Sequence, residues 1–471
     1  MNTLRRIFTF FTVVACALSV MALDLPVKTL NGTKYYYYKV KKNESVYGLS
    51  KKLGMSRDEI VRHNPAADDG IKKGMTLYFP YDEYATKSEP KAAVEEPIDT
   101  VAVDTASDKA SSIVLMLPFG LENKEQSRRN KLALDFYKGF LMAADTLASR
   151  NGLVEIHAID IDVENSRFDA ILHDEAVTNA SVIVAPDNGA AYRKIAKTAR
   201  ENGNYVLNVF LVADSLYTEN PNVLQANIPH LDMYRLAVDA FESDFKDYTP
   251  VILRNRTGRN EKEAFVSYFM ERCSQRGIVP IEISYENNLV SADLKNLATN
   301  AGQRYVFVPS SGSMTEFNKF AYVIKAIRDR AAVSGNDVSG AEFELFGYPD
   351  WTAYRGEALD TLHKLGATVY SRFFDDFNSF DSRTLQSNFR RWYGHSIIES
   401  IPSQAVLGYD TGCFLIKNLR ANDGAFDPVS PRSYSGLQST FDFDKSEQGY
   451  YNSTLYIIKY HTDGTMTSRT L

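Results

Sequence analysis

The chain has 471 residues, which is more than one hydrophobic core normally organises, so the length predicts two or three domains. Hydrophobic residues make up 44% and charged residues 24%, as in water-soluble globular proteins. The net charge of -6 argues against nucleic acid as the main partner.

The first segment has the pattern of an export signal. Arg5 and Arg6 precede the apolar run "IFTFFTVVACALSV", and Ala22 supplies a small residue at its end. This order predicts a signal peptide over residues 1–22, cleaved after Ala22. A second interpretation is a lipoprotein signal, because "VVAC" resembles a lipobox that would place a lipid on Cys16. The residues after Cys16 stay apolar, which favours simple cleavage.

Residues 34–80 have the pattern of a small compact unit. "TKYYYYKVKKN" predicts a strand, and "ESVYGLSKKLG" predicts a helix that ends at Gly54. "MSRDEIVRHN" predicts a second helix, because Ser56 and Glu59 have the spacing of a capping box. "GIKKGMTLYFP" predicts a turn and a final strand. The order is therefore strand, helix, helix, strand.

The next segment, residues 81–111, has the composition of a disordered linker. It is rich in Pro, Ala, Ser, Thr and acidic residues and contains few aromatic ones. Its charge is also opposite to that of its neighbour. Residues 34–80 contain ten Lys and Arg against five Asp and Glu, while residues 82–110 contain three Lys against eight Asp and Glu. A basic unit on an acidic tether would suit an anionic wall surface, although a solvated lysine face explains the charge equally well.

From residue 112 to the C-terminus, apolar runs alternate with helical patterns. Examples are "SVIVAPDNGAAYRKIAKTARENGNYVLNV" and "YVFVPSSGSMTEFNKFAYVIKAI". Continuous apolar strands followed by amphipathic helices predict α/β architecture, with largely parallel sheets covered on both faces.

The first unit resembles a LysM domain. The stretches that carry the resemblance are "YKVKKNESVYGLSKKLGMSRDEIVRHNP" and "GIKKGMTLYFP", which together span almost the whole module. The resemblance implies a βααβ fold that binds N-acetylglucosamine units of peptidoglycan glycan, in a shallow groove between two loops. The implied groove residues are Asn43, Glu44, Ser45, Val46, Tyr47, Pro65, Ala66, Ala67, Asp68, Asp69, Gly70 and Ile71. Turn amides could pair with the acetamido group, and small apolar side chains could contact the sugar face.

The segment 112–471 resembles type I periplasmic binding proteins of the branched-chain amino-acid receptor family. "FYKGFLMAADTL", "VIVAPDNGAAYRKIAKTA" and "VLQANIPHLDMYRLAVDAF" are among the stretches that carry the resemblance. It implies a bilobed, doubly wound α/β domain with ligand held between the lobes. Lobe one is expected at about 112–228 plus 372–425 and lobe two at about 229–371, with the last strands returning toward lobe two.

In that family the ligand lies at strand C-termini, where helix N-termini offer amides to a carboxylate. The corresponding cleft residues are Asp187, Asn188, Gly189, Ala190, Ser310, Ser311, Gly312, Ser313, Tyr348, Pro349 and Asp350. Asp187 departs from the Ser or Thr usual there, and an acid would repel a ligand carboxylate. "PSSGSMTEF" has the pattern of an anion nest, but serines that simply cap a helix explain it as well.

The sequence offers no visible catalytic machinery. It has no HExxH, no GxSxG and no paired His set, and its seven histidines are scattered. "DTG" at 410–412 falls in a helical pattern, which indicates a structural role, and Cys273 and Cys413 are expected to be buried apolar residues. We therefore expect no catalytic residue, no metal and no cofactor.

The predicted function is that of an exported bacterial cell-envelope protein with a peptidoglycan-binding domain. Its bilobed domain would bind or sense a small, amino-acid-like molecule. The alternatives are a ligand-free scaffold for envelope protein partners, and, further off, a wall hydrolase or an importer receptor. Nucleic acid is not an expected partner.

Overall fold

The computed structural model divides the chain into two compact units, residues 1–104 and 105–471. The described residues are 27–30, 33–41, 44, 46–53, 60, 64, 67 and 71–80 in the first unit, and 111–147, 154–161, 167–300, 302–333, 341–377 and 379–471 in the second. The expected signal peptide, nearly all of the expected linker and most of the expected second helix lie outside the described residues.

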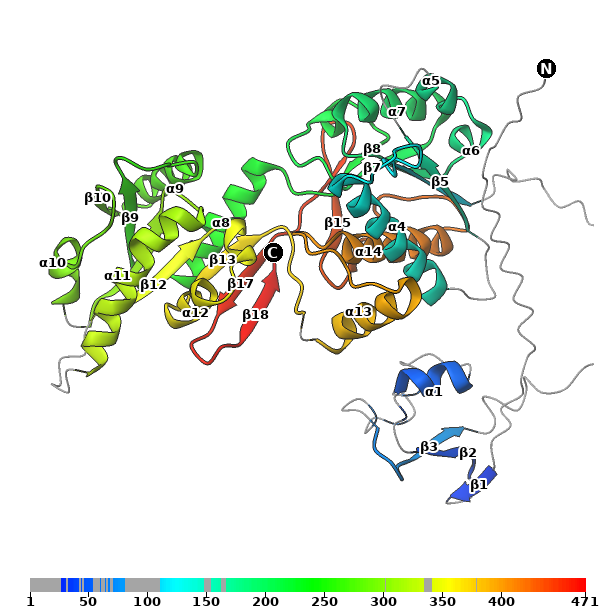
Figure 1. The fold of residues 1–471 in the computed structure, drawn as a ribbon, viewed down its shortest axis with the longest axis horizontal. Helices are drawn as coiled ribbons and strands as arrows, with labels where there is room; N and C mark the ends of the chain where they lie inside the picture. Colours follow the sequence, from blue (N-terminus) through cyan, green and yellow to red (C-terminus); the bar gives the residue numbers. More distant parts are fainter. Residues whose placement is uncertain are drawn as a thin grey trace, which may run out of the picture. The chain divides into compact units, whose positions relative to one another are not determined.

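The first unit contains a three-stranded antiparallel sheet and one described helix (Figure 1). The strands are β1 (Val27–Leu30), β2 (Thr33–Lys39) and β3 (Thr76–Pro80), and the helix is α1 (Val46–Leu53). β2 lies between the other two, so the Tyr-rich run forms the centre of the sheet. Leu49, Ile60, Leu77 and Phe79 are fully buried in its core. β1 is an additional strand that the sequence pattern did not indicate.

The second unit is built on two sheets. The first sheet has the strand order β14-β15-β16-β8-β7-β6-β4-β5. Its strands are β4 (Ser112–Leu117), β5 (Glu155–Asp160), β6 (Val182–Val184), β7 (Tyr205–Asn208), β8 (Val223–Gln225), β14 (Ser433–Ser435), β15 (Thr440–Lys445) and β16 (Tyr450–Asn452). All pairings from β16 to β5 are parallel, and β14 and β15 are added antiparallel.

The second sheet has the order β10-β9-β11-β12-β13-β17-β18. Its strands are β9 (Thr249–Asn255), β10 (Ile281–Tyr285), β11 (Arg304–Pro309), β12 (Glu342–Gly347), β13 (Thr368–Ser371), β17 (Tyr456–Tyr460) and β18 (Met466–Thr470). The first five pair in parallel, whereas β17 and β18 are antiparallel to their neighbours.

Helices cover both faces of each sheet, as the continuous apolar strands predicted. The helices of the first lobe are α4 (Arg128–Thr146), α5 (Phe168–Ile171), α6 (Glu175–Thr178), α7 (Gly189–Asn202), α13 (Phe380–Tyr393) and α14 (Gln404–Ala421). Those of the second lobe are α8 (His230–Asp244), α9 (Glu263–Gln275), α10 (Lys295–Ala298), α11 (Met314–Val333) and α12 (Glu357–Lys364). Each sheet has one core on either face, so the expectation of a doubly wound, bilobed α/β fold is confirmed.

The chain passes between the two sheets three times: after β8, after β13 and after β16. The expected division of the chain therefore needs one correction. The last strands do not all return to lobe two, because β14, β15 and β16 extend the first sheet and only β17 and β18 join the second. The reason is the parallel pairing of β16 with β8, which anchors this segment to lobe one.

No helix among the described residues is both long and apolar enough to pass through a bilayer. Cys273 and Cys413 are free and buried, as expected. The "DTG" sequence lies inside α14, which confirms its expected helical setting.

Candidate functional site

The structure describes five of the twelve residues expected in the glycan groove. They are Glu44, Val46, Tyr47, Ala67 and Ile71. Val46 and Ala67 are buried in the core, Ile71 is half-buried at its edge, and Tyr47 lies in α1 with its side chain outside the description. The place of these five residues in a glycan groove stays a prediction, and the burial of Val46 and Ala67 leaves little of their side chains for a ligand to contact. The other seven lie outside the described residues: Asn43, Ser45, Pro65, Ala66, Asp68, Asp69 and Gly70.

Glu44 fixes the loop that leads into α1. Its carboxylate accepts hydrogen bonds from the Tyr38 hydroxyl at 2.7 Å and the Lys41 amide at 2.6 Å. Lys52 lies 3.3 Å from the same carboxylate and donates to the Tyr38 hydroxyl at 2.7 Å. Partial burial opposes the charge, but these contacts together lower the pKa of Glu44. These neighbouring groups therefore favour the ionised form of the Glu44 carboxylate.

Asn64 joins the second loop to the sheet. Its side-chain amide donates to the carbonyls of Ile60 and Tyr78, at 3.1 Å and 3.0 Å, and its oxygen accepts from the Tyr78 amide at 2.7 Å. Asn64 is 8% exposed, so these three bonds satisfy an otherwise costly buried amide. The sequence pattern indicated Asn64 only as a helix stop before Pro65. Its link to β3 depends on a contact fourteen residues away, which local pattern does not reveal.

At the end of β6 in lobe one, the expected cleft residues are already paired. Arg129, at the start of α4, makes a forked contact with Asp187, with Nε 2.8 Å from one carboxylate oxygen and Nη2 2.5 Å from the other. Asn188 caps α7 by accepting from the amides of Ala190 and Ala191, both at 3.0 Å. Gly189 is the first residue of that helix. The amides of Ala190 and Ala191, which a ligand carboxylate could use, are thus occupied by the Asn188 side chain.

At the end of β11 in lobe two, an internal carboxylate fills the anion nest. One oxygen of Glu261 accepts from the Ser311 hydroxyl at 2.8 Å and from the Gly312 amide at 2.9 Å. Ser313 caps α11, because its hydroxyl accepts from the Glu316 amide at 3.3 Å. Ser310 is buried, and its hydroxyl donates to Asn260. Both interpretations of "PSSGSMTEF" therefore apply: the serines cap a helix, and the nest binds an anion that the chain provides.

A second internal ion pair lies beside this nest. Lys262 is 2.7 Å from the Asp350 carboxylate and 5.4 Å from the centre of the Tyr348 ring. Tyr348 is fully buried and donates to the Pro309 carbonyl, and burial raises the pKa of its hydroxyl well above the usual value. A Cβ on Gly312 would lie 2.9 Å from the Lys262 side chain and 3.1 Å from Asp350. The space beside the nest is therefore filled by side chains, and its two charges are paired with each other.

The charged residues that decide this picture are Arg129, Glu261 and Lys262, and the sequence analysis did not identify them. Each lies in a different segment from its partner, at separations of 58, 50 and 88 residues. Within the described residues, no group of three or more His, Cys, Asp or Glu side chains is placed to hold a metal ion. The candidate cleft residues can make ion pairs and hydrogen bonds, but their charged groups are already bound to other residues of the chain.

Comparison with known proteins gives a separate result for each unit. Residues 38–80 match the model of the LysM domain family. No curated protein sequence matches the chain. Among solved structures, the chain is similar to a putative branched-chain amino acid ABC transporter protein from Rhodospirillum rubrum, with 14% identity and a TM-score of 0.51 over 76% of this chain and 100% of that one.

Two further solved structures have lower TM-scores. One is an ABC transporter substrate-binding protein from Desulfitobacterium hafniense in complex with Leu, with 15% identity and a TM-score of 0.40 over 76% of this chain and 99% of that one. The other is LpoA from Haemophilus influenzae, with 15% identity and a TM-score of 0.45 over 76% of this chain and 58% of that one. At such identities the similarity concerns the fold alone.

Proposed function

Starting from a LysM domain joined to a fold of the type I periplasmic binding proteins, we propose that this chain is an exported, peptidoglycan-binding protein of the bacterial cell envelope. Its LysM domain holds the glycan through N-acetylglucosamine units, and its bilobed unit serves as a scaffold for protein partners. The export signal at residues 1–22, with cleavage after Ala22 or lipidation at Cys16, belongs to the same proposal. The protein acts by binding and not by catalysis.

The observation that carries the scaffold proposal is the Glu261 carboxylate in the nest of Ser311 and Gly312. The Arg129–Asp187 pair in lobe one is similar, because the Arg129 guanidinium is bound by a carboxylate of the chain itself. A receptor for small polar ligands needs convergent groups that are free to bind. Here the polar groups at both strand ends are bound by other residues of the chain, which favours a domain that contacts larger partners.

We expect the LysM domain to be necessary for wall binding. A variant that lacks residues 34–80 should remain in the supernatant when purified peptidoglycan is sedimented, whereas the full chain should sediment. The bilobed unit has its own cores, so circular dichroism of the shortened protein should still report a folded α/β domain. Equal sedimentation of the two proteins would contradict the proposal.

We also expect no free amino acid to stabilise the bilobed unit. A ligand present at a hundred times its Kd adds about 2.7 kcal/mol to the free energy of unfolding, which a thermal melt detects easily. Leucine and the other common amino acids, each at about 5 mM, should leave the Tm of the full chain unchanged. Glu261→Gln provides a matched variant in which the side chain that occupies the nest of Ser311 and Gly312 is uncharged. A rise in Tm of the unmodified protein with any amino acid would instead favour the small-molecule receptor.

A further inference from the structure

The last strand of the second sheet, β18, has one open edge. It lies at the end of the strand order, and among the described strands its one neighbour in the sheet is β17. Leu471 and Leu455 exchange both backbone hydrogen bonds, at 2.8 Å and 3.3 Å. Since hydrogen-bonded pairs alternate along an antiparallel ladder, the amides of Thr467 and Arg469 also face β17. The N–H and C=O groups of Met466, Ser468 and Thr470 therefore point to the open side.

This edge has few of the features that usually block strand addition. The strand sequence "MTSRT" contains no Pro and no Lys, and its residues Thr467 to Thr470 are exposed. Thr residues favour extended conformation. The one charged residue is Arg469, whose side chain is held toward Asp244 at the end of α8. Neither a Pro nor a Lys therefore protects the open backbone of this strand.

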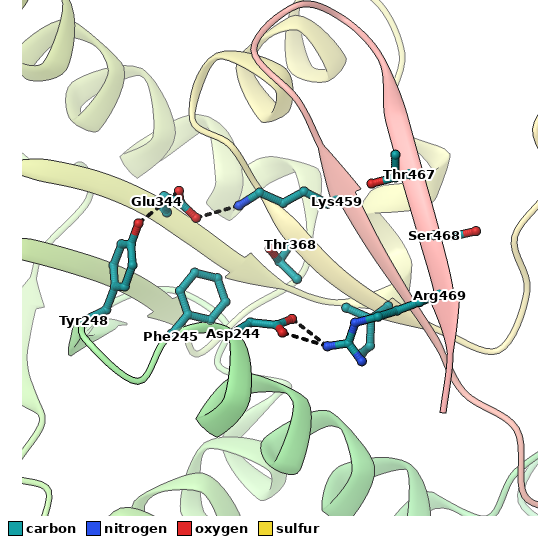
Figure 2. Close-up of a pocket in the computed structure, with 10 residues that line it drawn as sticks. Asp244, Phe245, Tyr248, Glu344, Thr368, Lys459, Thr467, Ser468 and Arg469 are labelled. Carbon is teal, nitrogen blue, oxygen red and sulfur yellow. Dashed lines mark hydrogen bonds and ion pairs between the residues drawn. The ribbon is translucent and has the colours of Figure 1, made fainter.

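A hollow of about 350 Å³ borders the same strand (Figure 2). It lies beside the end of α8 at Asp244 and is lined also by residues of β12, β13, β17 and β18. Its lining includes Asp244, Glu344, Lys459, Thr467, Ser468 and Arg469. Two ion pairs cross it, Glu344 with Lys459 at 2.6 Å and Asp244 with Arg469 at 2.7 Å.

Arg469 keeps unused donors in this hollow. Both of its contacts with Asp244 run through Nη2, at 2.8 Å and 2.7 Å. Within the described chain, its Nε and Nη1 groups have no hydrogen-bond partner, and the side chain is 43% exposed. A guanidinium carries five N–H donors, so a second carboxylate can accept a hydrogen bond from Nε–H on one side of the group or from Nη1–H on the other. The hollow therefore has space and directed donors directly beside an open strand.

From these two features we propose that β18 accepts an extended segment of a protein partner as an added strand, and that this segment places an Asp or Glu side chain against Arg469. Backbone hydrogen bonds to Met466, Ser468 and Thr470 would provide affinity. Cross-strand pairing would provide selectivity, because alternate side chains of the added strand lie beside Thr467 and Arg469 on the side of the hollow. This inference rests on the proposed scaffold function and names its partner class.

The test uses the full-length protein and an array of overlapping twelve-residue peptides that covers the exported proteins of the same cell. We expect the bound peptides to be rich in β-branched residues and to carry one acidic residue. Ser468→Pro removes an N–H that points outward and leaves the pairing with β17 intact, so it should weaken binding about tenfold. Ser468→Ala keeps that N–H and should bind as the unmodified protein does.

A second variant tests the acidic contact. Arg469→Gln should bind a selected peptide and its Glu→Gln form equally, whereas the unmodified protein should prefer the Glu form by about threefold to tenfold. Thermal melts of the variants establish that each is folded.

Three results would overturn the inference: an array without bound peptides, peptides that bind Ser468→Pro as well as Ser468→Ala, or a dimer of the chain that Ser468→Pro dissociates. The last result would make a second copy the occupant of the edge. Peptidoglycan sedimentation and the amino-acid melts are read separately, so loss of peptide binding alone rejects the strand addition. A rise in Tm with an amino acid would reject the scaffold function itself.

Discussion

At the scale of single residues, Asp410 is a fully buried carboxyl group with three backbone partners. It is fully buried in α14, and its carboxylate accepts from the amides of Leu437, Gln438 and Ser439 at 2.8–2.9 Å. A Cβ on Gly436 would lie 2.3 Å from the Asp410 carboxyl carbon, so only glycine fits the approach. One side chain therefore fixes a turn that lies nearly thirty residues further along the chain.

This burial predicts a pH dependence of stability. Burial raises the pKa of Asp410 to about 7, although the three backbone hydrogen bonds oppose the shift. The folded state then binds more protons than the unfolded state between about pH 4 and pH 7. The free energy of unfolding should therefore fall as the pH rises through this window, by about 1.4 kcal/mol for each unit of pKa difference. Burial also raises the pKa values of Asp135 and Asp375, which adds to the same trend.

Urea denaturation at a series of pH values measures this slope. Asp410→Asn should flatten it, and should lower stability by about 1–3 kcal/mol at pH 5 because its amide group faces backbone donors. A slope that is identical in the two proteins would show that Asp410 does not titrate in this range.

At the scale of elements, the contact between α4 and α14 is the closest helix packing of the first lobe. A Cβ on Gly139 would lie 1.8 Å from the Ala405 carbonyl oxygen, and a Cβ on Gly408 would lie 1.9 Å from that of Phe136. Neither distance is compatible with a side chain, so the helix backbones touch directly at these two positions. The short separation explains why Gly occurs inside two long helices despite its low helix propensity.

We expect Gly408→Ala to destabilise the bilobed unit. The added methyl group must push the two helices apart, and overpacking of this kind costs about 1–3 kcal/mol. Gly189→Ala is the matched control, because a Cβ there meets only the end of the Arg193 side chain at 3.5 Å. The control should stay within about 0.5 kcal/mol of the unmodified protein in urea denaturation. Equal losses in both variants would contradict the close-packing explanation.

At the scale of the whole molecule, the sequence predicted the type and order of most elements. Apolar runs such as "SIVLML" form strands buried on both faces. These signals are local and depend on a few neighbouring residues. The pairing of β16 with β8 and the contact of Glu261 with Gly312 join segments far apart in the chain, so no window of sequence contains them. For this reason the architecture could be predicted, whereas the pairing of the candidate cleft residues with other side chains of the protein could not.

The three passages of the chain between the sheets have a mechanical consequence. The segment that leads from the LysM domain enters the bilobed unit at β4 in the first sheet, while the open edge of β18 belongs to the second. Under the proposed function, a load between the wall and a partner on β18 would pass from one lobe to the other through these three connecting segments. The lobes can be pulled into a different angle by such a load, but they cannot be separated without breaking a peptide bond or unravelling a sheet.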